Sequence, residues 1–273
     1  MSNTPPRSVL GKEGDPSPPP VRRPVLLGAV FLALVCGFVG IFVGLSIGGL
    51  RELRNTAKIR ADPVAADIIL PFLDSADSRL VFLGDSRIAQ WNPLPESDGC
   101  SSTGIGAGGL TAPQLAGCLG LYEGDLSGRT VLVQIGINDL KTIGYSDRSQ
   151  EEIVEATRAA LQVIRDRLVA SGAEVRIMTI LPPGAVRLAR RVIWTPRINQ
   201  AVAGINRSLV AGEIVPADEV LDLGDLLGTE EKLAPDYSKD ALHLNPEGYQ
   251  VLSQAVRESM PDLFLERTEP PGD

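Results

Sequence analysis

Short apolar runs alternating with longer amphipathic stretches constrain the fold of this chain more than any other feature. Three runs have the length and composition of buried strands, at residues 79–84 (RLVFLG), 130–136 (TVLVQIG) and 175–181 (VRIMTIL). Apolar side chains recur near helical spacing at residues 151–170, 197–211 and 246–260. Buried strands connected through helices build a parallel sheet that is covered on both faces. The sequence therefore predicts an α/β fold, a three-layer α/β/α sandwich around a mostly parallel sheet.

Residues 25–50 are a different kind of segment, because they contain no charged side chain. About 20 apolar residues suffice to cross a bilayer as a helix. A cleaved signal peptide has an apolar region of only about 7 to 15 residues, and no convincing cleavage site follows this run. Val35 stands where a lipid attachment signal at Cys36 would need a small residue. We therefore expect one transmembrane helix.

The side of the membrane on which the folded domain lies does not follow from charge. Two arginines precede the apolar run and two follow it, at positions 22, 23, 51 and 54. Outside the run, Cys100 and Cys118 could form one disulfide in an oxidising compartment, or they could be two buried thiols. We expect an extracytoplasmic domain, on the periplasmic or cell-surface side. Gly40, Gly44 and Gly48 share one face of the helix at small-xxx-small spacing, which could support a homodimer.

The rest of the chain divides around this helix. Residues 1–24 are rich in proline and predict a disordered tail, and residues 51–73 predict a juxtamembrane spacer. The folded domain is expected at residues 74–265, followed by a polar tail at 266–273. A net charge of -8 argues against nucleic acid as a partner, because phosphate binding requires a cationic face. No cluster of Cys and His suggests a metal site, and no cofactor is expected.

Polar residues gather where the predicted strands end, which is the ligand side of a parallel sheet. Gly84-Asp85-Ser86 follows the first strand, and Gly136-Ile137-Asn138-Asp139 follows a later one. Far along the chain, Asp240-Ala241-Leu242-His243 precedes Asn245-Pro246, where Pro246 can begin the last helix. His243 is the single histidine.

These three blocks, in this order, resemble the SGNH (GDSL-type) hydrolase family over residues 79–260. The resemblance implies a flavodoxin-like fold and an enzyme that acts on esters. It also implies that Ser86 attacks an ester carbonyl, that His243 activates it, and that Asp240 orients His243. The implied donors to the oxyanion are the Ser86 backbone N–H, a glycine N–H of a further block, and the Asn138 side chain.

The chemistry of the residues agrees with these roles. A serine hydroxyl is a poor nucleophile unless a nearby imidazole accepts its proton, and a carboxylate can fix the tautomer of that imidazole. Asp85 and Asp139 are expected to be structural, as caps or as acceptors for loop N–H groups.

The glycine block departs from the family pattern, because the usual asparagine before the glycine is missing from Ser102-Thr103-Gly104-Ile105-Gly106-Ala107-Gly108-Gly109. We place the donor at Gly108, with Gly106 as the second choice. The same stretch fits the dinucleotide motif G-x-G-x-x-G, but no clear buried strand precedes it.

The segment at residues 182–197 follows a strand on the ligand side and is rich in arginine. Arg190, Arg191 and Trp194 could bind an anionic glycan or a lipid headgroup, or the segment could be a solvated loop. Arg87 and Trp91 lie one helical turn apart beside Ser86 and could line the pocket or pack structurally.

The function expected is a membrane-anchored serine esterase that acts on small acyl esters, most simply acetyl esters, of an envelope carbohydrate. The residues leave three alternatives open. These are an O-acetyltransferase of an extracytoplasmic polysaccharide, a lysophospholipase or lipase, and a glycan-binding module without catalysis.

Overall fold

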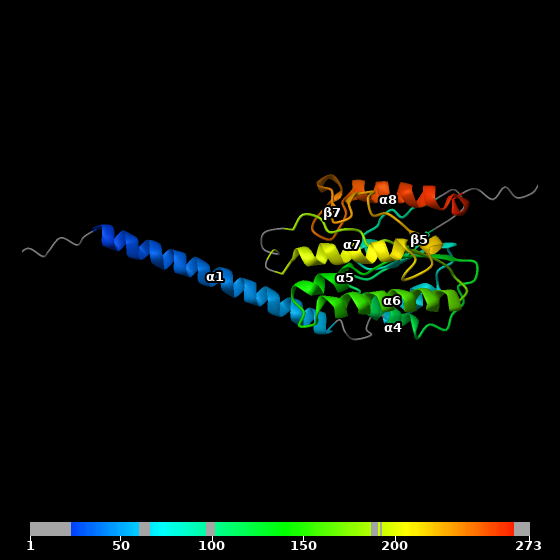
Figure 1. Ribbon diagram of the computed structural model, residues 1–273, viewed down its shortest axis with the longest axis horizontal. Helices are drawn as coiled ribbons and strands as arrows, with labels where there is room; N and C mark the ends of the chain where they lie inside the picture. Colours follow the sequence, from blue (N-terminus) through cyan, green and yellow to red (C-terminus); the bar gives the residue numbers. More distant parts are fainter. Residues whose placement is uncertain (1–22, 60–65, 97–101, 187–190, 192, 265–273) are drawn as a thin grey trace, which may run out of the picture. The chain divides into compact units, whose positions relative to one another are not determined.

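The structure is a computed structural model that describes residues 23–59, 66–96, 102–186, 191 and 193–264 (Figure 1). Residues 1–22 of the predicted tail, the tail at 266–273, Cys100 and Arg190 lie outside the described residues.

Helix α1, Arg23–Ile59, contains the predicted transmembrane segment. Its stretch Phe31–Gly49 has a mean hydropathy of 2.4 and none of it is buried. By length and composition this stretch could cross a membrane, although a signal sequence would have the same properties.

Within the described residues, five parallel strands form the central sheet in the order β2-β1-β3-β4-β5. They are β1 Leu80–Gly84, β2 Ser102–Gly106, β3 Thr130–Gln134, β4 Glu174–Met178 and β5 Val220–Leu221. This order is that of flavodoxin-like doubly wound folds, and it places β1 between β2 and β3. The predicted parallel sheet is confirmed.

Alternate side chains of each strand point to opposite faces of the sheet. Helices pack on both faces, so the sheet has a hydrophobic core on each side. Val81 of β1 and Val133 of β3 belong to a core that includes residues of α2, α4, α5, α6 and α7. Phe82 and Leu132 belong to a second core that includes residues of α3 and α8. The helices are α2 Ala66–Asp74, α3 Ser86–Ala89, α4 Ala112–Leu119, α5 Ile137–Leu140, α6 Gln150–Ala170, α7 Pro196–Val210 and α8 Pro246–Ser259 (Figure 1). The three-layer sandwich is thus confirmed.

Smaller elements complete the described chain. They are the 3₁₀ helices η2 Lys141–Gly144, η4 Ala217–Glu219, η5 Pro235–Tyr237 and η6 Pro261–Leu263, and the hairpin strands β6 Gly228–Thr229 and β7 Lys232–Leu233.

The folded unit begins earlier than predicted. Helix α2 lies in the segment expected to be a spacer, but Ile69 and Leu73 have no exposed surface and belong to the main core. Each such side chain contributes about 1.5–3 kcal/mol by burial, so α2 is part of the domain. Helix α2 therefore packs into the folded domain, although it precedes residue 74.

The strand β2 was not predicted from the sequence, and Cys118 lies in the core. Residues 102–106 form β2, although only Ile105 among them is a large apolar residue. Cys118 is a free thiol that is fully buried in the core. Cys100 lies outside the described residues, so the choice between a disulfide and two buried thiols stays open.

Candidate active site

The carboxyl ends of β1, β2 and β3 bring three of the predicted segments together. Ser86 follows β1, the turn at Gly108 follows β2, and Asn138 follows β3. Because β1 lies between the other two strands, Ser86 is flanked by the glycine turn on one side and by Asn138 on the other.

Ser86 is the first residue of α3 and is half-buried. The preceding Gly84 permits the close pairing of β1 with β3, since a Cβ at this position would lie 2.0 Å from the Gln134 carbonyl oxygen. Asp85 is the N-cap of α3, and its carboxylate accepts a hydrogen bond from the Arg87 backbone N–H at 2.9 Å. Burial raises the pKa of Asp85, against the lowering effect of the Arg87 charge. Asp85 thus has the structural contacts that the sequence predicted.

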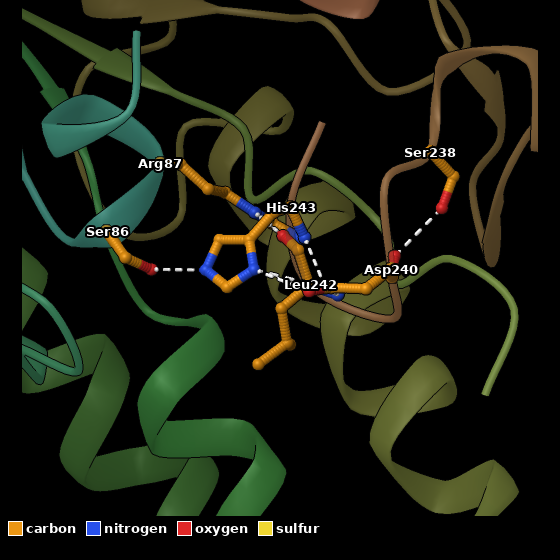
Figure 2. A network of polar contacts seen from close by, with 6 residues as sticks. All are labelled: Ser86, Arg87, Ser238, Asp240, Leu242 and His243. Carbon is orange, nitrogen blue, oxygen red and sulfur yellow. Dashed lines mark hydrogen bonds and ion pairs between the residues drawn. The ribbon is translucent and has the colours of Figure 1, made fainter. Parts of the chain in front are cut away.

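A chain of hydrogen bonds connects Ser86 with His243 and Asp240 (Figure 2). The Ser86 Oγ lies 3.0 Å from His243 Nε2, although the two residues are 157 positions apart in the sequence. His243 Nδ1 lies 3.1 Å and 3.0 Å from the two carboxylate oxygens of Asp240. An Nδ1–H that donates to the carboxylate leaves the lone pair of Nε2 facing the serine hydroxyl.

Asp240 remains ionised in this arrangement. Desolvation raises the pKa of the carboxyl, but the hydrogen bonds from the His243 ring and from the backbone N–H groups of Leu242 and His243 lower it to about 2. A carboxylate charged at neutral pH stabilises an imidazolium when His243 accepts a proton.

Arg87 has structural contacts, in agreement with the second of the two roles that the sequence left open. Its side chain is buried and donates to three backbone carbonyls, with Nε to Leu242 at 2.7 Å, Nη1 to Leu181 at 2.7 Å and Nη2 to Pro182 at 3.4 Å. Leu242 immediately precedes His243, so Arg87 connects the nucleophile helix to the histidine loop (Figure 2).

Trp91 is also structural. Helix α3 ends at Ala89, so the helical spacing assumed between Arg87 and Trp91 is not formed. The indole packs on Phe82 and Tyr249, with ring centroids 5.0 Å and 5.7 Å away. Its N–H donates to the Ser253 hydroxyl at 3.0 Å. Trp91 thus packs structurally, which is the second of the two roles that the sequence left open.

Asn138 lies in the first turn of α5 and is 3% exposed. Its side-chain nitrogen donates to the Leu110 carbonyl at 3.0 Å, and its side-chain oxygen accepts from Lys141 Nζ. The neighbouring Asp139 accepts the Ala112 N–H with both carboxylate oxygens, at 3.2 Å and 3.0 Å. Burial raises the pKa of Asp139 to about 7. The α5 segment is thereby attached to the start of α4, and Asp139 has the structural contact that was expected.

Gly106 and Gly108, the two candidates for the backbone donor, have different surroundings. The Ala107 N–H continues the β2 ladder by donating to the Gly84 carbonyl at 3.1 Å, and the chain then turns at Gly108 and Gly109. Gly106 lies inside β2, where a Cβ would be 2.3 Å from the Ala89 backbone nitrogen. Gly108 is exposed and has no atom within 4 Å of a Cβ position. A close approach of backbones therefore explains Gly106, whereas Gly108 lies in the open turn.

The arginine-rich segment contributes few described contacts. Arg190 lies outside the described residues, and Arg191 is exposed. Trp194 is half-buried, packs against the main core, and donates its indole N–H to Asn199 Oδ1 at 3.0 Å. A role of Arg190, Arg191 and Trp194 in binding substrate stays a prediction.

The contacts of two residues at this site were not predicted from the sequence. Lys141 was not singled out, although its position three residues after Asn138 on a helical turn was a usable signal. The contacts of Arg87 with the histidine loop bridge 155 positions, so no local pattern could reveal them. Among the described residues, no three His, Cys, Asp or Glu side chains gather as a metal site would require.

Comparison with known proteins gives a consistent family and fold. The sequence profile described as the GDSL-like lipase/acylhydrolase family matches residues 82–251, more than half of the chain. A structure from Streptococcus pneumonia, described as a platelet activating factor, is 20% identical with a TM-score of 0.52, over 84% of this chain and 99% of that chain. A GDSL-like lipase from Bacteroides thetaiotaomicron is 19% identical with a TM-score of 0.50, over 78% and 98%. Identities this low show a shared fold alone. No curated protein matches the chain significantly.

Proposed function

The chain belongs to the GDSL-like lipase/acylhydrolase family, and from this premise we propose that it is an ester hydrolase whose catalytic triad is Ser86, His243 and Asp240. The observation that carries the proposal is the continuous set of hydrogen bonds from Ser86 Oγ through the His243 ring to the Asp240 carboxylate. Ser86 lies near the start of the domain sequence, and Asp240 and His243 lie near its end. Activation of a nucleophile explains why these three side chains are brought together in this order.

The reaction would proceed through two acyl transfers. His243 Nε2 accepts the hydroxyl proton while Ser86 Oγ bonds to the ester carbonyl carbon. The resulting imidazolium, stabilised by Asp240, gives this proton to the departing alcohol oxygen, which leaves an acyl-serine. A water then loses a proton to His243, attacks the acyl carbon and releases the carboxylic acid, and the proton returns to Ser86 Oγ.

The oxyanion that forms in each step would be held by the N–H groups of Ser86 and Gly108 and by the Asn138 side chain. The sheet order supports this grouping, because β2 and β3, which precede Gly108 and Asn138, lie on either side of β1. Ser86 also stands at the start of α3, where backbone N–H groups have no partner within the helix. Removal of one such donor typically slows turnover about 100- to 1,000-fold.

The natural substrate would be a small acyl ester, most simply an acetyl ester of an envelope carbohydrate. The apolar stretch Phe31–Gly49 supports this choice, since a membrane tether with an extracytoplasmic domain would hold the site near the envelope. In this arrangement Gly40, Gly44 and Gly48 would be available for a homodimer contact between helices. Transfer of the acyl group to a glycan hydroxyl is the second candidate, because the same acyl-serine serves both reactions.

A substrate panel tests the proposal with the full chain in detergent micelles. We expect release of acetate from a small acetyl ester, loss of this activity in Ser86→Ala, and normal activity in the control Ser75→Ala, which alters an exposed serine. Candidate glycans added to the same reaction show whether acetyl transfer competes with hydrolysis.

Two outcomes would contradict the proposal at different levels. Undiminished acetate release by Ser86→Ala would refute the mechanism. A clear preference for long-chain lipid esters over acetyl esters would refute the substrate class and favour the lipase alternative.

A further inference from the structure

Lys141 is the first residue of η2 and contacts the side chain of Asn138, the proposed oxyanion donor. Lys141 contacts the oxygen of the Asn138 amide, whereas Leu110 contacts its nitrogen. The Lys141 Nζ lies 2.5 Å from the Asn138 side-chain oxygen, while the side-chain nitrogen of Asn138 lies 3.0 Å from the Leu110 carbonyl oxygen. Asn138 is buried and Lys141 is half-buried, so this contact is largely withdrawn from water.

The two neighbours of Asn138 determine which way its amide group points. An ammonium has only donor hydrogens, and a backbone carbonyl has only acceptor lone pairs. A flipped amide would therefore place its NH₂ group against the Lys141 ammonium and its oxygen against the Leu110 carbonyl, so that both contacts would be repulsive. Lys141 and Leu110 thus permit one orientation, in which the nitrogen is on the Leu110 side.

This orientation leaves one hydrogen available for a ligand. The amide nitrogen has two hydrogens, and Leu110 accepts one of them. Among the described residues, no acceptor for the second hydrogen is found. An oxyanion donor requires such a hydrogen, held in place before the reaction begins.

The charge on Lys141 has a second effect on the same amide. A hydrogen bond from an ion is about twice as strong as one between neutral groups, and it draws electron density toward the accepting oxygen. The nitrogen of a polarised amide is a better donor, and chains of hydrogen bonds strengthen one another in this way. The benefit grows when negative charge develops on the substrate oxygen, so it acts on the transition state more than on bound substrate.

We propose that Lys141 is a positioning residue for ester hydrolysis, which fixes and polarises the Asn138 side chain as an oxyanion donor. The inference rests on the proposed function, because it requires that Asn138 contact the oxyanion. A competing role is purely structural, since Lys141 also lies near the buried carboxylates of Asp85 and Asp139 and could serve only to compensate their charge.

A double-mutant cycle separates the two roles in the full chain in detergent micelles. Lys141→Met is measured alone and in an Asn138→Ala background, with acetate release from a small acetyl ester as the readout. We expect Lys141→Met to lower kcat about tenfold with an unchanged KM, and to have less than about a twofold effect once Asn138 is absent. Lys141→Arg, which keeps a charged donor, should restore part of the loss.

A matched control and a stability measurement complete the design. Lys232→Met removes an exposed lysine and should leave kcat and KM unchanged. The urea midpoint of each variant shows whether it is folded under assay conditions. If Lys141→Met is not folded, Lys141→Gln is measured in its place.

Three results would overturn the inference. They are an unchanged kcat in Lys141→Met, an equal fold-loss in both backgrounds, and a loss that appears only in KM. Absence of turnover by the wild-type chain would instead refute the proposed function, and the inference would then fail with it.

Discussion

Replacing Arg87 with methionine removes the buried cation that connects α3 to the histidine loop. The two carbonyls at 2.7 Å, those of Leu242 and Leu181, lose a charged donor, and the Pro182 carbonyl at 3.4 Å loses a weaker one. A hydrogen bond to a charged group contributes about 1.5–3 kcal/mol, so the two short bonds together account for about 3–6 kcal/mol. Methionine no longer bears the desolvation cost of a guanidinium, which offsets part of this loss.

The removal also takes away the positive charge that acts most strongly to lower the pKa of the buried Asp85 carboxyl. We therefore expect Arg87→Met to lose about 3–5 kcal/mol of its free energy of unfolding, out of the about 5–15 kcal/mol of a typical domain.

Pulse proteolysis in urea measures this loss on the full chain in detergent micelles. The matched control is Arg207→Met, because the Arg207 side chain is 64% exposed and pairs with Glu230 on the surface. Exposed pairs contribute about 0–1 kcal/mol, so the control should unfold close to the wild-type midpoint. If Arg87→Met unfolds at the same urea concentration as Arg207→Met, the three carbonyls have other donors and the structural role assigned to Arg87 is wrong.

Two further predictions concern Asp139 and the glycines at and after the end of β2. Because burial raises the pKa of Asp139 to about 7, the native state holds a proton that the unfolded state, with a pKa of 3.8, has released. The stabilisation from the proton on Asp139 is fully present below the unfolded pKa and is lost as pH rises through about 7. The free energy of unfolding of the wild type should therefore fall relative to that of Asp139→Asn between about pH 5 and about pH 8. Urea unfolding at the two pH values checks this, and a constant difference would contradict it. Gly106→Ala should lower the thermal midpoint, since its Cβ would lie 2.3 Å from the Ala89 nitrogen, while Gly108→Ala should leave the midpoint near that of wild type; the reverse ranking would show that the turn is misassigned.

The elements that the sequence predicted best are those with strong periodicity. The strands β1, β3 and β4 and the helices α6 and α7 agree with their predicted ranges within a few residues. Each is long enough or apolar enough for local composition to determine its state.

The elements that were missed owe their structure to distant contacts. β2 consists of Ser102–Gly106 and contains two glycines, so it is a strand because β1 pairs with it along its whole length. α2 contains Pro71 and begins soon after α1 along the chain, and its packing on α4 and β2 shows that it belongs to the domain.

The site was predicted from residue types at strand ends, and its supporting contacts were not. A serine, an asparagine and a histidine after predicted strands or before a helix can be found in sequence, because parallel strands end at one edge. The contact of Arg87 with Leu242 joins residues 155 positions apart, which no local pattern reveals. The Lys141 contact depends on the rotamers of two side chains, which a sequence does not specify.

Covalent labelling of the full chain with a fluorophosphonate is the most direct test of Ser86 as the nucleophile. Such a reagent reacts with a serine that an adjacent base has activated, and peptide mass spectrometry identifies the residue that carries the adduct. We expect a single adduct on the peptide that contains Ser86, its absence from Ser86→Ala, and much slower labelling of His243→Ala. An unlabelled wild-type chain, or an adduct that persists in Ser86→Ala, would contradict the proposed triad.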